Sequence, residues 1–184
     1  MHFDQFSDTI KACRTCLMCR HACTVGNVTQ LDTVLPRGKA LILYGQQVGL
    51  LKWDQRAVDV MYQCTNCHLC REWCVSRYDI APLLLAARAD IVEMGLAPKT
   101  ALAVKYNLEQ AGNPYGEIPS RAPEWARPAE APAVDVLFYA GCTTTYRRPE
   151  MARTAITLIE RSGVRAATLA DESCCGEPLH VLGF

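Results

Sequence analysis

The sequence predicts an α+β protein, with an all-helical half at residues 1–112, a proline-rich linker at 113–133 and a partial α/β unit at 134–184. Two observations carry this prediction. In the first half, apolar residues recur at helical spacing around two cysteine-rich runs, and no segment alternates in the manner of a strand. After the linker, a helical pattern lies between two short apolar runs rich in β-forming residues, which is the order of a β-α-β unit.

Length and charge narrow the classes of function. At 184 residues the chain is long enough for one ordinary domain or two small ones. Lys plus Arg and Asp plus Glu both number 19, so no basic surplus indicates nucleic-acid binding. The longest apolar runs, such as "APLLLAA" at 81–87, are too short to span a bilayer, and the N-terminus lacks the pattern of a signal peptide. We therefore expect a cytoplasmic protein that reaches a membrane surface only through a partner.

Helices are expected on both sides of each cysteine run. The helix before the first run has four positions at helical spacing: Phe3, Phe6, Ile10 and Cys13. Asp54 is the predicted N-cap of the helix before the second run. The apolar positions of that helix are Val58, Met61 and Tyr62.

The helices that follow the two runs also have apolar stripes. After the first run, the predicted buried face consists of Leu41, Tyr44, Val48 and Leu51. After the second run, Asp79 is expected to cap a helix that Gly95 ends. The stripe of this helix consists of Ile80, Leu84, Ala87, Ile91 and Met94. One more helix is expected at 98–111.

The second half has a different pattern. "VDVLFYA" at 134–140 and "VRAATL" at 164–169 are typical of buried parallel strands. The helix expected between them, at 149–162, ends at Gly163. Its predicted inward residues are Met151, Ala155, Leu158 and Ile159. Before this unit, the linker contains five prolines and few aliphatic residues, and we expect its Trp125 to dock on a neighbouring surface.

Eleven cysteines are many for a chain of this length. Their odd count and tight clustering fit a disulfide framework poorly, and nothing indicates secretion. Eight of them form two runs, "CRTCLMCRHAC" at 13–23 and "CTNCHLCREWC" at 64–74, both spaced C-x2-C-x2-C-x3-C. In two-cluster ferredoxins of this spacing, three cysteines of a run hold one 4Fe–4S cluster and the fourth ligates the other cluster.

We therefore predict two 4Fe–4S clusters with crossed ligation. The expected ligands of one cluster are Cys13, Cys16, Cys19 and Cys74. Those of the other cluster are Cys64, Cys67, Cys70 and Cys23. The alternative is a pair of zinc sites, but zinc sites usually have separated C-x2-C pairs with a long gap between them.

Basic residues lie inside both runs: Arg14, Arg20, His21, His68 and Arg71. Two interpretations stay open. These side chains form a solvated basic face, or their charge stabilises the reduced, more anionic clusters and raises the reduction potentials. A histidine ligand is not needed, because eight cysteines suffice for two cubanes.

The remaining three cysteines follow the predicted strands. Cys142 comes after the first strand, and Cys174 and Cys175 come after the second. The carboxyl ends of parallel strands lie at one edge of a sheet, where open α/β folds bind ligands, so these thiols should converge. A second interpretation is that they are buried free cysteines.

Two stretches carry a family resemblance. The gap of 40 residues between the runs, with "LDTVLPRGKALIL" at 31–43, resembles the α-helical ferredoxin domain of glycolate oxidase iron–sulfur subunits and heterodisulfide-reductase-like proteins. "FYAGC", followed 31 residues later by "SCCGEP", resembles the first half of the cysteine-rich CCG domain.

This resemblance implies a third iron–sulfur site with Cys142, Cys174 and Cys175, which a further C-x-x-C would complete. The sequence ends at Phe184 without that motif. We therefore expect a fragment of a longer protein, or a domain that another polypeptide completes. A third cluster is expected only in the completed domain.

The leading functional hypothesis is an electron-transfer subunit of an oxidoreductase complex that relays single electrons through two 4Fe–4S clusters. The resemblance implies other redox subunits as partners, namely a flavoprotein or a membrane subunit that carries quinone or haem. One alternative is a fragment of a catalytic disulfide reductase subunit, and another is a zinc-stapled interaction module. The sequence leaves open whether the chain is an enzyme, because catalysis would need a partner or the missing C-terminal part.

Overall fold

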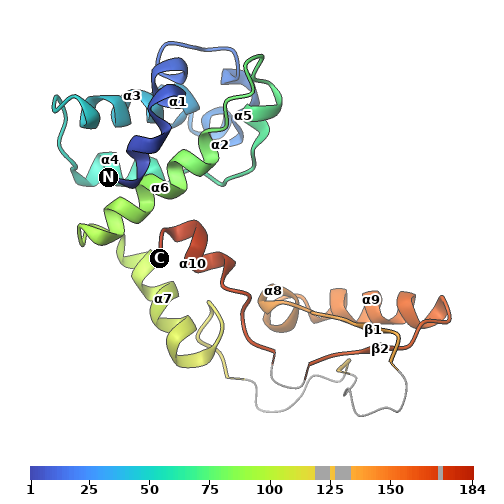
Figure 1. Cartoon of the computed structure of the whole chain (residues 1–184). Coiled ribbons are helices and arrows are strands. Elements are labelled where there is room, and N and C mark those ends of the chain that lie inside the picture. The colour runs from blue at the N-terminus through green and yellow to red at the C-terminus, as the bar shows by residue number, and fades with distance from the viewer. Residues whose placement is uncertain (119–124, 127–133, 170–171) are drawn as a thin grey trace. The chain divides into compact units, whose positions relative to one another are not determined.

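The computed structural model describes residues 1–118, 125–126, 134–169 and 172–184 (Figure 1). The chain forms two compact units. One consists of Met1–Ala101 and Leu179–Phe184, and the other of Leu102–Pro178. The predicted α+β class is confirmed, since the described chain is mostly helical with one small parallel sheet near its C-terminal end. Most of the predicted linker at 113–133 lies outside the described residues, and the domain limits remain predictions.

The first unit is built from short helices, and residues 1–101 contain no strand. The helices before and within the first cysteine run are η1 (His2–Phe6), α1 (Ser7–Cys13) and η2 (Arg20–Ala22). Those between the runs are α2 (Thr24–Thr29), η3 (Asp32–Val34), α3 (Pro36–Gln47) and α4 (Gln55–Tyr62). The second run contains α5 (Leu69–Glu72), and α6 (Ile80–Glu93) follows it. Helix α7 (Lys99–Ala111) begins at the end of this unit, and α10 (Glu177–Leu182) returns to it.

The predicted helix limits rest on caps that the structure contains. The carboxylate of Asp54 accepts the N–H of Ala57 at 2.8 Å at the start of α4. The carboxylate of Asp79 accepts the N–H of Ala81 at 3.0 Å at the start of α6. Gly95 follows α6 with a φ of 72°, a conformation that favours glycine. These three sequence predictions are therefore confirmed.

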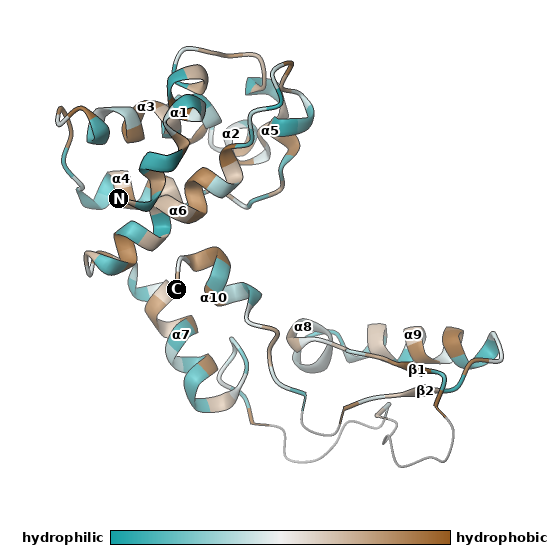
Figure 2. Cartoon of the chain, viewed as in Figure 1, coloured by the Kyte–Doolittle hydropathy of each residue, from teal (hydrophilic) through white to brown (hydrophobic). Residues whose placement is uncertain are grey.

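Helix α6 is the centre of the core, and Figure 2 shows hydrophobic residues along much of its length. Of its predicted stripe, only Met94 is exposed. The core residues of this unit are Phe3, Ile10, Ala40, Leu43, Val58, Met61, Ile80, Leu83, Leu84, Ala87 and Ile91. The stripe before the first run packs here as well, with Phe3 and Ile10 fully buried and Phe6 and Cys13 at the edge of the core.

The predicted face of α3 was wrong at three of its four positions, and only Tyr44 packs against the core. Leu41, Val48 and Leu51 are 49%, 46% and 46% exposed, whereas Ala40 and Leu43 are fully buried. Both sets fit helical periodicity, because neighbouring positions on a helix differ by about 100°. The packing of α3 on α1 and η3 decided which set faces inward.

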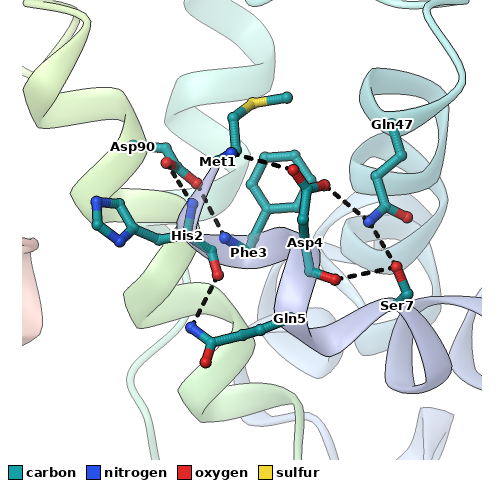
Figure 3. Close-up of polar contacts among 8 residues, drawn as sticks. All are labelled: Met1, His2, Phe3, Asp4, Gln5, Ser7, Gln47 and Asp90. Atoms are coloured by element: carbon teal, nitrogen blue, oxygen red, sulfur yellow. Dashed lines mark hydrogen bonds and ion pairs between the residues drawn. The ribbon is translucent and has the colours of Figure 1, made fainter.

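The N-terminus is anchored to α6 by one buried carboxylate (Figure 3). Asp90 is 4% exposed, and its two oxygens accept the N–H groups of His2 at 2.7 Å and Phe3 at 3.1 Å. These N–H groups belong to the first turn of η1, where no partner exists within the helix. Because η1 continues into α1, which ends at Cys13, this anchor helps to position the first cysteine run.

Replacing Asp90 with alanine should lower the free energy of unfolding by about 2–4 kcal/mol, because two N–H groups in a buried position lose their acceptor. Denaturant unfolding followed by circular dichroism measures the change. The matched control is Glu93→Gln, whose exposed carboxylate contacts only the His2 ring in this cluster, at 2.7 Å. The control should change by less than about 0.5 kcal/mol. Equal losses in the two variants would contradict the anchoring role.

The second unit contains the β-α-β order that the sequence predicts. Strands β1 (Val136–Leu137) and β2 (Ala166–Ala167) pair in parallel, with α8 (Cys142–Tyr146) and α9 (Pro149–Arg161) between them. Val136 lies opposite Ala166 in the register. Beside this pair, the Arg165 guanidinium holds the pKa of Asp135 down to about 2 through hydrogen bonds. The strands are much shorter than the predicted runs at 134–140 and 164–169.

The core of this unit is small. Ala152 and Ile156 of α9 are buried together with Trp125, so the docking predicted for this aromatic is confirmed. The predicted inward face of α9 is partly wrong, because Met151 and Leu158 are 58% and 63% exposed. A two-residue strand pair covers only a narrow face of a helix, which leaves room for one i, i+4 pair inside.

Candidate metal centres

Short turns shape both cysteine runs. In the first run, α1 ends at Cys13, and the Cys23 sulfur caps α2 by accepting the N–H of Gly26 at 3.4 Å. In the second run, Asn66 and His68 have positive φ values of 51° and 55°. The left-handed conformation of these two residues turns the backbone tightly. It lets cysteines that are separated by two intervening residues face a common centre.

The two runs are packed against each other. The His21 ring meets the Trp73 ring edge to face, with centroids 4.5 Å apart. This contact places the end of each run beside its twin, because His21 precedes Cys23 and Trp73 precedes Cys74. The fourth cysteine of each run therefore lies within reach of the other run.

The first cavity contains cysteines from both runs. Its lining thiols are Cys13, Cys16, Cys19, Cys70 and Cys74. Cys13, Cys16 and Cys19 come from the first run and are the three ligands expected from that run for one cluster. Cys74 comes from the second run and lines the same cavity. The pKa of Cys13 is raised to about 12, mainly by burial and further by the neighbouring thiols of Cys74, Cys19 and Cys16.

The second cavity has the reverse composition. Its lining thiols are Cys23, Cys64, Cys67 and Cys70. Burial raises the pKa of Cys70 to about 12, and the proximity of Cys19 and Cys64 raises it further. Cys70 lies between the cavities, as do the buried residues Pro36 and Ile80, which line both. The two centres are therefore neighbours, and thiols with such raised pKa values need a bound cation to persist as thiolates at neutral pH.

Zinc sites and iron–sulfur clusters require different distances between the ligating sulfurs. Four thiolates on one zinc ion lie about 3.8 Å apart, as follows from a tetrahedral Zn–S distance of about 2.3 Å. Within the described residues, only His2, Asp90 and Glu93 have three ligating atoms within 4.8 Å of one another. No set of three cysteines is gathered that closely there. The repeated C-x2-C-x2-C-x3-C spacing favours a cubane, in which each thiolate binds a different iron.

The group of His2, Asp90 and Glu93 is explained without a metal. Both Asp90 oxygens already accept backbone N–H groups, and the His2 ring contacts Glu93. The carboxylate of Glu93 raises the pKa of His2 by this hydrogen bond. We therefore interpret the group as the N-terminal anchor described above.

The basic residues inside the runs lie at the surface. Arg20 pairs with Asp32 at 3.1 Å, and His68 pairs with Asp79 at 2.8 Å. The Arg14 guanidinium stacks over the Tyr44 ring, with its central carbon 4.3 Å from the ring centroid. These contacts favour the interpretation as a solvated basic face.

Sequence reasoning missed two cations that are buried. Lys39 is 2% exposed and lines the second cavity, and its ammonium donates to the carbonyl of Val34. Arg88 is 3% exposed and donates to the carbonyl of Cys64 at 2.6 Å. Burial lowers the pKa of both groups, while nearby thiols, Cys64 among them, raise it. For Arg88 the available signal was its position one turn after Leu84, on the predicted stripe of α6. Lys39 gave no such signal, because it lies on a face of α3 that the sequence did not identify.

The third group of cysteines lies in the second unit. The thiols of Cys142 and Cys174 lie close together, and burial raises the pKa of Cys142 to about 12, with a further contribution from Cys174. Cys175 is near enough to raise this pKa further. The loop is closed by Glu172, whose carboxylate accepts the N–H groups of Ala140 at 2.9 Å and Gly141 at 2.6 Å. The structure thus brings together the strand-end cysteines, as the sequence predicts.

Cysteine-lined cavities in a helical unit, together with a third cysteine group in an α/β unit, define an iron–sulfur protein. Residues 9–77 match the family model of the 4Fe-4S dicluster domain, and residues 136–184 match that of the CCG cysteine-rich domain. The chain combines these two domains, and the dicluster domain implies two 4Fe–4S clusters. The predicted resemblance and the predicted clusters are confirmed.

The curated relatives are distant, and two of them are named as a redox enzyme or a subunit of one. One subunit of the dihydromethanophenazine:CoB–CoM heterodisulfide reductase of Methanosarcina mazei is 29% identical over 126 residues, covering 66% of this chain and 31% of that protein. EtfAB:quinone oxidoreductase of Syntrophomonas wolfei subsp. wolfei is 26% identical over 148 residues, covering 72% of this chain and 21% of that protein. An uncharacterized iron–sulfur protein of Methanocaldococcus jannaschii is 24% identical and covers 95% of this chain and 37% of that protein.

The chain thus spans about a fifth to somewhat over a third of the length of these relatives. No solved structure matches it. In the described part of the chain, none of the helices combines the length and apolar character needed to cross a membrane.

Proposed function

We propose that this chain is the electron-transfer part of an oxidoreductase complex and relays single electrons through its two 4Fe–4S clusters. The observation that carries the proposal is the pair of neighbouring cavities, each lined by cysteines of both runs. Two adjacent one-electron centres suit a relay, because an electron can pass from one to the other within the chain.

The proposed ligands follow the cavities. Cys13, Cys16, Cys19 and Cys74 would hold the first cluster. Cys23, Cys64, Cys67 and Cys70 would hold the second, since that cavity has only three cysteines besides Cys70. When bound, each cluster takes up and releases one electron at a time.

The remaining lining residues would shape the relay. Pro36 and Ile80 are buried between the cavities and keep water out of the space that separates them. Met18 and Tyr78 line the outer part of the first cavity, where they limit solvent access. Rigid lining residues that exclude water reduce solvent reorganisation and tune the reduction potential of a bound cluster.

The proposed partners follow from the relatives. One is a subunit of a heterodisulfide reductase, and another is named as an oxidoreductase acting between EtfAB and quinone. By analogy, this chain would pass electrons between a flavoprotein and a quinone- or haem-bearing membrane subunit. Its association with a membrane would then depend on that partner.

Anaerobic reconstitution with iron and sulfide tests the proposal. We expect about eight iron and eight acid-labile sulfide ions per chain, because two 4Fe–4S clusters require them. Partial chemical reduction should give the EPR signal of a reduced 4Fe–4S cluster, and full reduction that of two interacting clusters. A colourless protein that carries zinc and no acid-labile sulfide would overturn it in favour of a zinc-stapled module.

A second candidate is a part in disulfide reduction, favoured by the proximity of Cys142, Cys174 and Cys175. It requires a third cluster on the CCG domain, and hence more than about eight irons per chain in the completed protein. The excess iron should disappear in Cys142→Ser and Cys174→Ser. An iron content that these variants leave unchanged would reject this candidate and leave the electron relay in place.

A further inference from the structure

The first turn of α3 lies between the two cavities and presents one cation to each. Pro36 lines both cavities, Arg37 lines only the first, and Lys39 lines only the second. Residues two positions apart on a helix differ by about 200° in direction, so Arg37 and Lys39 necessarily face opposite sides. The motif Pro-Arg-Gly-Lys therefore places a positive charge beside each centre.

Gly38 fixes this turn in place. A Cβ atom at this position would lie 2.4 Å from the carbonyl oxygen of Asp32 and 2.5 Å from that of Thr33. Only glycine lets the start of α3 approach η3 so closely. The positions of Arg37 and Lys39 relative to the cysteines are thus set by backbone packing rather than by side-chain flexibility.

The two cations are not equivalent, because they differ in burial. Lys39 is 2% exposed, and its ammonium is held by the carbonyl of Val34. Arg37 is half-buried, and its Nε donates to the carbonyl of Arg14 at 3.2 Å. Water screens a half-exposed charge strongly, whereas a buried charge acts through a medium of lower dielectric constant. The second cavity therefore receives the stronger field.

Arg88 adds a second buried cation on the same side. Its guanidinium donates to the carbonyls of Cys64 at 2.6 Å and Met61 at 2.8 Å. Among the described residues, neither Arg88 nor Lys39 has a carboxylate at ion-pair distance. Buried cations without an anion are costly, so this pair points to an anionic group in the second cavity.

The other charged groups near the second cavity largely balance one another. His68 lines the cavity and is paired with Asp79 at 2.8 Å. Arg71 lies 3.8 Å from the same carboxylate. The single negative charge of Asp79, which raises the pKa of Cys70, is thus offset locally, and the two buried cations decide the sign of the field.

We propose that Lys39, supported by Arg88, gives the cluster of the second cavity a higher reduction potential than its neighbour, so that an electron entering the chain comes to rest there. The inference rests on the proposed function, because it assumes that both clusters are present. Reduction adds one negative charge to a cluster, and a fixed positive charge stabilises that state. The transfer balances as one electron lost by the first cluster and one gained by the second.

The experiment is an anaerobic redox titration of the reconstituted chain, monitored by EPR. The signals are assigned to the two cavities through Cys16→Ser and Cys67→Ser, which remove one ligand from each set. In the parent protein, the second-cavity cluster should be reduced first. Lys39→Met should change the equilibrium distribution of one electron between the two clusters about tenfold in favour of the first cluster. For a one-electron couple this corresponds to a fall of about 59 mV in the reduction potential of the second-cavity cluster.

Two further variants separate charge from packing. Lys39→Arg keeps the charge and should retain the parent order of potentials. Arg37→Gln removes the cation of the first cavity and should lower only the first potential, by less than Lys39→Met lowers the second. Iron and sulfide counts of each variant establish that both clusters are present.

Several outcomes would overturn the inference. One is that the first-cavity cluster of the parent protein is reduced first. Another is that Lys39→Met leaves the reduction potential of the second-cavity cluster unchanged. A third is that Lys39→Met shifts the reduction potentials of both clusters equally. In each case iron counts of about eight would leave the electron-relay proposal intact. A parent protein without clusters would instead defeat the proposed function itself.

Discussion

Replacing Cys74 with serine should deplete the cluster of the first cysteine run, although Cys74 belongs to the second run. Cys74 lines the cavity that contains Cys13, Cys16 and Cys19, and it is absent from the cavity of Cys64 and Cys67. A serine hydroxyl is a poor substitute for a thiolate, so the iron content should fall from about eight to about four per chain. Cys23→Ser should show the reverse pattern and deplete the cluster of the second run.

Double variants make this prediction specific. If Cys74 and Cys16 serve one cluster, the variant Cys16→Ser/Cys74→Ser should lose no more iron than either single variant. The variant Cys67→Ser/Cys74→Ser should lose both clusters, because it removes one ligand from each set. Cys142→Ser is the matched control outside the dicluster domain and should leave the two cubanes unchanged. If Cys74→Ser instead perturbed only the EPR signal of the second run's cluster, crossed ligation would be wrong.

The second large effect is expected for Arg88→Met. The Arg88 guanidinium joins two distant segments, because it donates to the carbonyls of Met61 and Cys64 and to that of Val181. It also stacks over the ring of Tyr62, with its central carbon 5.2 Å from the centroid. Methionine has a similar length but donates no hydrogen bond. Leaving these acceptors unpaired should lower the free energy of unfolding by about 3 kcal/mol or more.

The loss should be uneven between the two centres. Because Arg88 holds the backbone of Cys64, the cluster of the second cavity should lose iron to a chelator faster than the cluster of the first cavity. Iron release followed by absorbance and EPR measures this difference. Arg56→Met is the matched control, since Arg56 is an exposed arginine of α4 in the same unit, and it should change stability by less than about 0.5 kcal/mol. Equal effects of the two variants would refute the role of Arg88.

The proposals differ in what they require of the chain. The electron relay needs only the residues that line the two cavities, all of which lie in the first unit. The disulfide chemistry needs a complete CCG site, for which this chain provides Cys142, Cys174 and Cys175. The proposed order of the two potentials requires the two clusters of the relay but not the CCG site. It follows from the burial of Lys39 and Arg88 beside one of two otherwise similar cysteine sets.

The sequence alone determined the cofactor class and the local structure. The repeated C-x2-C-x2-C-x3-C spacing indicates cubane clusters, because two-residue gaps allow one short loop to bind three irons. The caps Asp54 and Asp79 and the stop at Gly95 were equally readable, since each acts within a few residues of the chain. The order β-α-β was visible for the same reason, although the paired strands are much shorter than the apolar runs.

Only the tertiary structure decided which helix faces are buried and where charge is buried. The stripe with Leu41 and Val48 is as periodic as the one with Ala40 and Leu43, and packing on α1 selected the second. Lys39 looks like a solvent-exposed lysine in the sequence, yet it is enclosed beside the second cavity. Burial depends on which distant segments meet, and periodicity reports only directions around one helix. For that reason the sequence specified two equal cysteine sets, and the fold made their surroundings unequal.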